Sequence, residues 1–225
     1  MAKKIKAVVF DAYGTLFDVY SVEASAERMF AGHGKTLAQL WRDKQIEYTR
    51  LRTMSGRHAD FWTVTGDALA WSCERLGLAL QPQQQDQLMR QYESLVSFPE
   101  NLAALRLLRE RGFPLGILSN GTPAMLRSAI TAAGMDGLFA HVLSVESVGK
   151  FKTAPEVYQL APDAFGCEAP DILFVSSNGW DACGATWFGF TTFWLNRAGL
   201  PAERLGVAPT TTGRSMQDVV AYLSR

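Results

Sequence analysis

Short apolar runs that stop abruptly at polar residues constrain the fold of this 225-residue chain more than any other feature. The first run, Ala7–Phe10, ends at Asp11 and is followed by Gly14 and Thr15, a pair that can form a turn. A short run that is apolar at every position is typical of a strand buried on both faces of a parallel sheet. The sequence therefore predicts a first strand with a carboxylate at its carboxyl end.

The segment from Val19 to Ser97 has a different pattern. Its apolar residues recur at helical spacing, with polar residues between them, and it contains no run that resembles a strand. We expect helices over four ranges: Glu23–Phe30, Leu37–Arg52, Gly66–Leu76 and Gln83–Val96. This stretch is therefore predicted to be a helical insertion after the first strand.

After residue 97 strand-like and helix-like segments alternate. Strands are expected near 114–118, 141–144, 172–175 and 191–195, and helices over 101–111, 123–134, 155–165 and 181–188. Beyond them we expect an irregular tail with a small helix near Met216–Leu223. Alternation of this kind indicates βαβ units, right-handed crossovers and a parallel sheet.

Composition excludes several classes of protein. The chain has 22 Lys and Arg against 22 Asp and Glu, so no basic field favours nucleic acid or an anionic membrane. Cys73, Cys167 and Cys183 are odd in number and lack the spacing of a zinc site, which indicates reduced, packing cysteines. The run after the basic N-terminus is too short for a signal peptide, and no run has transmembrane length. We expect a cytoplasmic protein.

Polar residues follow the predicted strands at the point where each strand ends. In an open parallel sheet, ligands bind beyond the carboxyl ends of the strands, where helix N-termini favour anions. Any one of these residues alone could equally be a helix cap or a turn residue. Together they predict a site for an anionic ligand, built from Asp11, Ser119, Asn120, Lys150 or Lys152, and the segment Ser176–Asp181.

These residues resemble a known family. The start Asp11-Ala-Tyr-Gly-Thr-Leu, the pair Ser119-Asn120, Lys152 and the Ser176–Asp181 cluster are similar to the haloacid dehalogenase superfamily. Within it, the run Ser-Ser-Asn-Gly-Trp-Asp-Ala-Cys-Gly-Ala-Thr-Trp-Phe-Gly looks most like the (S)-2-haloacid dehalogenases. The resemblance implies an α/β fold with a Rossmann-like parallel-sheet core flanked by helices (1–18 and 98–225) and a helical cap (19–97). It also implies a homodimer.

Two departures from the superfamily's phosphatases favour breaking a carbon–halogen bond. Tyr13 stands where phosphatases typically carry a second Asp that protonates the leaving oxygen, and Ser177 stands where an Asp for Mg²⁺ is expected. A halide needs no proton to depart, and Mg²⁺ prefers carboxylate and phosphate oxygens. We therefore expect neither metal nor cofactor. A Mg²⁺-dependent phosphatase and a non-catalytic binding module remain as alternatives.

The resemblance assigns catalytic roles around an ester intermediate on Asp11, formed with inversion at the α-carbon of a small halogenated acid. Lys152 would pair with Asp11, Thr15 and Ser176 would fix its carboxylate, and Asp181 with Asn178 would activate water. Lys150 is a rival because Thr153 replaces the family's usual proline after the lysine, but the spacing from Lys152 to Tyr158 favours Lys152.

The remaining predicted residues would contact substrate. Arg42 matches the family's halide-side arginine, although without the resemblance its position would favour a surface arginine on an amphipathic helix. Phe61 and Trp180 would form apolar walls, or simply pack in the core. The full predicted binding set is Ala12, Tyr13, Arg42, Phe61, Ser119, Asn120, Tyr158 and Trp180. The sequence does not predict which halogen is preferred.

Overall fold

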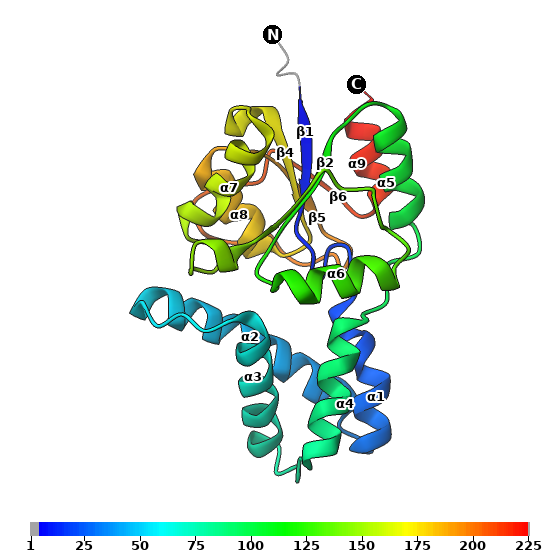
Figure 1. The fold of residues 1–225 in the computed structure, drawn as a ribbon, viewed down its shortest axis with the longest axis vertical. Coiled ribbons are helices and arrows are strands. Elements are labelled where there is room, and N and C mark those ends of the chain that lie inside the picture. The colour runs from blue at the N-terminus through cyan, green and yellow to red at the C-terminus, as the bar shows by residue number, and fades with distance from the viewer. Residues whose placement is uncertain (1–4, 225) are drawn as a thin grey trace.

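A parallel six-stranded sheet forms the centre of the computed structural model, which describes residues 5–224 (Figure 1). The strand order is β3-β2-β1-β4-β5-β6. The strands are β1 (Ala7–Phe10), β2 (Leu115–Ser119), β3 (His141–Ser144), β4 (Ile172–Ser176), β5 (Thr191–Leu195) and β6 (Thr211–Gly213). The predicted α/β fold is confirmed, and β1 lies between β2 and β4 with all four of its residues buried.

Helices cover both faces of this sheet. Figure 1 shows α5 and α9 on one side and α7 and α8 on the other. The helices are α5 (Asn101–Glu110), α6 (Pro123–Ala132), α7 (Pro155–Phe165), α8 (Gly179–Phe188) and α9 (Met216–Tyr222), with short 3-10 turns at Val145–Ser147 and Ala169–Asp171. Burial between two helical layers explains why the central strands are apolar at nearly every position.

Residues between β1 and α5 contribute helices and no strand, as predicted. They form a 3-10 turn at Val19–Val22, then α1 (Glu23–Met29), α2 (Gly34–Ser55), α3 (Phe61–Arg75) and α4 (Pro82–Glu93). In Figure 1 these four α-helices lie together beyond the carboxyl end of β1. Trp41, Leu69 and Tyr92 are almost fully buried among them and belong to the same apolar cluster as the residues of β1.

The C-terminal tail differs from the prediction. It was expected to be irregular up to its last helix, but Thr211–Gly213 forms β6 and pairs in parallel with β5, Phe193 opposite Thr211. Three residues, two of them threonine and one glycine, are too few to show an apolar pattern. Pairing with β5, rather than a hydrophobic pattern of its own, makes this segment a strand.

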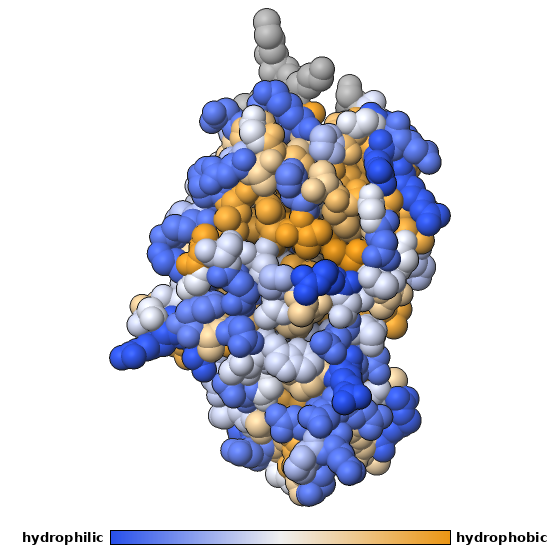
Figure 2. Space-filling view, viewed as in Figure 1, coloured by the Kyte–Doolittle hydropathy of each residue, from blue (hydrophilic) through white to orange (hydrophobic). Residues whose placement is uncertain are grey.

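The surface is mostly hydrophilic over the α1–α4 group, whereas apolar residues gather on the visible face of the sheet-containing part (Figure 2). Among the described residues, no helix combines the length and the apolar character needed to cross a membrane.

Candidate active site

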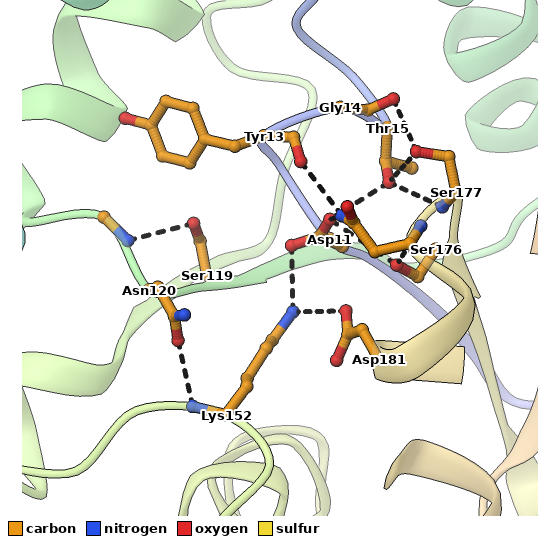
Figure 3. Close-up of polar contacts among 12 residues, drawn as sticks. Asp11, Tyr13, Gly14, Thr15, Ser119, Asn120, Lys152, Ser176, Ser177 and Asp181 are labelled. Carbon is orange, nitrogen blue, oxygen red and sulfur yellow. Dashed lines mark hydrogen bonds and ion pairs between the residues drawn. The ribbon is translucent and has the colours of Figure 1, made fainter. Parts of the chain in front are cut away.

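Asp11 lies immediately beyond β1 and is only 5% exposed. Its Oδ1 accepts a hydrogen bond from Lys152 Nζ at 2.9 Å. Its Oδ2 accepts from Asn178 Nδ2 at 2.8 Å and from Thr15 Oγ1 at 3.1 Å, with Ser176 Oγ at 3.5 Å (Figure 3). The two oxygens are therefore held by four side chains that come from three separate parts of the chain.

The turn after Asp11 explains how Thr15 reaches back to it. Gly14 has φ of +92°, a conformation that a residue with a Cβ rarely adopts, and the backbone N–H of Leu16 donates to Ala12 O at 2.8 Å. Ser177 completes the turn: its N–H donates to Thr15 Oγ1 at 2.8 Å, and its hydroxyl to Gly14 O at 2.5 Å. Sequence reasoning treated Ser177 only as a lost acid and missed this structural contact.

Lys152 is 1% exposed and lies between two carboxylates. Its Nζ is 2.9 Å from Asp11 Oδ1 and 2.8 Å from Asp181 Oδ2. Burial lowers the pKa of Lys152, but attraction to Asp11 and Asp181 outweighs burial and leaves the pKa above its usual value. The rival Lys150 pairs with Glu156 in a partly exposed position. The peptide bond from Lys152 to Thr153 is cis.

Asp181 lies in the first turn of α8, fully buried. Its Oδ1 accepts a hydrogen bond from the Tyr158 hydroxyl at 2.7 Å. Burial raises the pKa of Asp181 above its usual range, and the Asp11 carboxylate adds to the effect, while Lys152 opposes it. Tyr158 thus contacts Asp181 and is not among the residues that line the cavity, so its predicted place in the substrate-binding set is not confirmed.

A small cavity, partly open to solvent, lies in front of Asp11. Arg42 reaches it from α2, where Nη2 donates to Tyr13 O at 3.2 Å and to Asn178 Oδ1 at 3.4 Å. The structure thus brings α2 and α3 against the strand ends. The lining residues are Asp11, Tyr13, Arg42, Ile46, Thr49, Phe61, Ser119, Asn120, Asn178 and Trp180.

The predicted carboxylate-binding residues lie on the β2 side of this cavity. Ser119 Oγ accepts from the Gly121 N–H at 3.1 Å, and Asn120 Oδ1 accepts from the Lys152 N–H at 3.0 Å. These bonds orient both side chains along the cavity wall. Ala12 is fully buried beside Asp11 and is not among the lining side chains, so only its backbone N–H could serve a ligand.

Three residues of α2 escaped the sequence-based prediction. Ile46 and Thr49 line the cavity, and Gln45 accepts a hydrogen bond from Arg42 Nη1 at 2.8 Å. Gln45, Ile46 and Thr49 stand three, four and seven residues after Arg42, the spacing that places side chains on one helix face. The spacing groups these residues on one face of α2, but only the position of Arg42 in the fold shows that this face is the one turned toward the cavity.

The donors around Asp11 do not fit Mg²⁺, the ion that the superfamily's phosphatases usually hold. The two nearby carboxylates, Asp11 and Asp181, both bind the Lys152 ammonium. Ser176, Ser177 and Asn178 supply only neutral groups on the other side. Within residues 5–224 no cluster of three or more His, Cys, Asp or Glu side chains could hold a metal ion. A hard divalent cation favours a set richer in carboxylates.

Comparison with known proteins agrees with this fold. The model of the haloacid dehalogenase-like hydrolase family matches residues 5–189. An (S)-2-haloacid dehalogenase from Pseudomonas sp. (strain YL) is 44% identical, over 96% of this chain and 93% of that protein. A haloacetate dehalogenase H-2 from Moraxella sp. (strain B) is 41% identical, over 99% of both chains. The protein therefore belongs to the haloacid dehalogenase-like hydrolase family.

Solved structures extend the likeness to three dimensions. A crystal structure of an L-2-haloacid dehalogenase superposes with a TM-score of 0.97 at 58% identity, covering 99% of this chain and 100% of the other. The L-2-haloacid dehalogenase from Xanthobacter autotrophicus, with chloropropionic acid covalently bound, gives a TM-score of 0.91 at 36% identity, over 98% of both chains.

Proposed function

We propose that this protein is an (S)-2-haloacid dehalogenase, which hydrolyses short (S)-2-haloacids, haloacetates included, to (R)-2-hydroxyacids and halide through an ester on Asp11. The observation that carries the proposal is the placement of one buried ammonium, Lys152, between the carboxylate of Asp11, which lines the cavity, and that of Asp181. Such an array supplies a nucleophile, a fixed positive charge and a base for water. The names of the relatives support the substrate class.

In the first half-reaction an Asp11 oxygen attacks the α-carbon, and the carbon–halogen electron pair leaves with the halide. Hydrogen bonds from Lys152 and Asn178 hold the carboxylate, so attack begins from a fixed orientation. Ser119, Asn120 and the Ala12 N–H bind the substrate carboxylate.

The departing halide and the substrate's carbon atoms need different surroundings. Arg42 reaches the cavity from α2 and stabilises the charge that develops on the halide. Tyr13, Phe61 and Trp180 form the apolar wall of the same cavity. An apolar wall strengthens the charge interactions inside it and excludes competing water.

In the second half-reaction water attacks the carbonyl carbon of the Asp11 ester and gives its proton to Asp181. Burial raises the pKa of Asp181, which makes this carboxylate a stronger base than an exposed aspartate. Tyr158 fixes its orientation. The bond between the Asp11 carbonyl carbon and the substrate oxygen then breaks, and the substrate oxygen takes the water's second proton to become the product hydroxyl as Asp11 returns to a carboxylate. The α-carbon is therefore displaced only once, and its inverted configuration survives.

We also propose that residues 19–97 act as a cap domain over a core of residues 1–18 and 98–225, of which residues 1–4 and 225 lie outside the described part. Support comes from the cavity, whose lining combines Arg42 and Phe61 with Asp11 and Ser119. A cytoplasmic homodimer is proposed from the family resemblance. Leu51 and Met54 on α2, 51% and 83% exposed, are apolar side chains that such a dimer could cover.

A single-turnover experiment in ¹⁸O-water tests the covalent mechanism. With enzyme in excess over (S)-2-chloropropionate, label should enter Asp11 and not the first product, as mass spectrometry of both would show. Label that goes directly into the product would mean that water, not Asp11, attacks the α-carbon. Asp11→Asn is the control and should release no halide.

Assays of the competing activities separate the alternatives. Halide release from (S)-2-chloropropionate and phosphate release from a generic phosphoester are measured with and without EDTA. Phosphate release that requires Mg²⁺, without any halide release, would replace the dehalogenase by the phosphatase. A measured function left intact by Asp11→Asn would favour a binding module.

A further inference from the structure

Gln45 is a polar side chain with no exposed surface, one helical turn after Arg42 on α2. Its Oε1 accepts hydrogen bonds from Arg42 Nη1 at 2.8 Å and from the Tyr92 hydroxyl at 3.0 Å. Its Nε2 donates to Thr65 Oγ1 at 2.7 Å. Burying an amide is costly unless its groups are paired, and here both ends have partners.

The neighbours of Gln45 determine which way its amide points. Thr65 Oγ1 donates its proton to Phe61 O at 2.6 Å, so it can only accept from the amide nitrogen. The Tyr92 hydroxyl and the Arg42 guanidinium then both face the amide oxygen. Because Tyr92 lies on α4 and Thr65 on α3, three helices fix one oxygen atom beside the guanidinium.

The acceptors around Arg42 are all neutral. They are Gln45 Oε1, Tyr13 O and Asn178 Oδ1, and none of the ion pairs found in residues 5–224 includes Arg42. Arg42 is only 8% exposed, so its guanidinium is surrounded mainly by protein groups. A neutral acceptor orients a cation without cancelling its charge, whereas a carboxylate at 2.8 Å would cancel much of it.

We propose that Gln45 is a positioning residue for the departing halide, an inference that rests on the proposed role of Arg42. Its amide holds the guanidinium at the cavity while leaving the positive charge free for the anion that forms as the carbon–halogen bond breaks. Gln45 does not line the cavity itself and acts only through Arg42.

The leaving group provides a readout that loss of packing alone would not move. Chloride is a poorer leaving group than bromide and depends more on charge stabilisation, so the ratio of kcat/KM for (S)-2-chloropropionate to that for (S)-2-bromopropionate reports on the guanidinium. Gln45→Met removes the acceptor at similar volume. Gln45→Glu places a carboxylate beside Arg42. We expect Gln45→Met to lower the chloride value roughly 10-fold and Gln45→Glu roughly 100-fold, each with a smaller loss for bromide.

Two further variants make the result interpretable. Ser72→Ala removes another buried hydroxyl of α3, one that bonds only to Ala68 O, and should leave the ratio unchanged. Arg42→Lys should lower the ratio directly. Circular dichroism and thermal unfolding of every variant report on the fold.

A lowered ratio in both Gln45 variants and in Arg42→Lys, but not in Ser72→Ala, supports the inference. An unchanged ratio in either Gln45 variant, with a lowered one in Arg42→Lys, overturns the role of Gln45 and leaves the proposed function standing. An unchanged ratio in Arg42→Lys removes the halide role of Arg42 and the inference with it. A lowered ratio in Ser72→Ala would mean that general packing of these helices sets the ratio, and also overturns the inference.

Discussion

Replacing Asp181 by Asn should separate the two half-reactions. The proposed mechanism needs Asp181 as a base only when water attacks the ester, whereas halide release uses Asp11, Lys152 and Arg42 and does not need that base. The Asn side chain keeps the size of the original and can retain both contacts, accepting from Lys152 Nζ and donating to the Tyr158 oxygen. The variant is therefore expected to fold and to accumulate the ester.

The ion-pair distances show why Lys152 should stay charged in this variant. In an effective dielectric constant of about 20, the Asp181 carboxylate at 2.8 Å attracts Lys152 Nζ by about 6 kcal/mol before the cost of desolvation. Asp11 at 2.9 Å contributes an attraction of nearly the same size and is untouched. The first half-reaction should thus lose less than about tenfold, while hydrolysis of the ester should slow by roughly 10²–10⁴, the usual value of a general base.

Quench-flow halide measurement and mass spectrometry provide the assay. Asp181→Asn mixed with excess (S)-2-chloropropionate should release about one halide per site in a burst, and Asp11 should gain the mass of one carboxyethyl group. Asp11→Asn, the matched control, should show neither. A folded Asp181→Asn variant that gives no burst, or that turns over as fast as the unsubstituted protein, would refute the separate roles of Asp11 as nucleophile and Asp181 as base.

Three further predictions concern pH, metal and packing. Because burial raises the pKa of Asp181, kcat should fall on acidification at a pH above the usual aspartate range. Burial lowers the pKa of Lys152, but its two carboxylate partners raise it more, so the loss of kcat at alkaline pH should lie above the usual lysine range. An acid limb within the usual aspartate range would contradict the first expectation, and an alkaline limb within or below the usual lysine range would contradict the second. EDTA should leave halide release unchanged. A loss of halide release in EDTA that added Mg²⁺ restores would contradict the conclusion that the side chains around Asp11 do not fit Mg²⁺. Leu69→Ala, at a fully buried position, should lower the free energy of unfolding by about 2–5 kcal/mol in urea titrations; a loss below about 1 kcal/mol would disagree.

Much of the fold could be predicted because buried segments show a distinct pattern of apolar residues in the sequence. The range Ala7–Phe10 coincides with β1, since every residue is apolar and a carboxylate ends the run. Pro155–Phe165 likewise coincides with α7. The segment Thr211–Gly213 could not be predicted, because its strand conformation comes from pairing with β5 and not from its own residues.

The site, too, could be predicted only in part. Residues at strand ends, such as Asp11 and Ser176, could be placed at one edge because a parallel sheet brings its carboxyl ends together. The bond from Asn178 to Asp11 and the contact of Gln45 with Arg42 depend on how whole helices pack, which spacing along the chain does not encode. The catalytic roles assigned to these residues stay predictions.

The ammonium held between two carboxylates has a consequence for turnover when formal charges are added up. Asp11 and Asp181 balance Lys152 and Arg42, so the empty site is neutral, and an anionic substrate brings it to minus one. Alkylation removes the charge of Asp11 and creates a halide, so neutrality returns only when that halide departs. Hydrolysis restores the Asp11 charge and leaves a proton on Asp181, so the site stays neutral until that proton escapes to solvent. The halide is thus an excess anion as it forms, and the hydroxyacid becomes one once the proton has escaped, so release of the proton favours clearance of the second product.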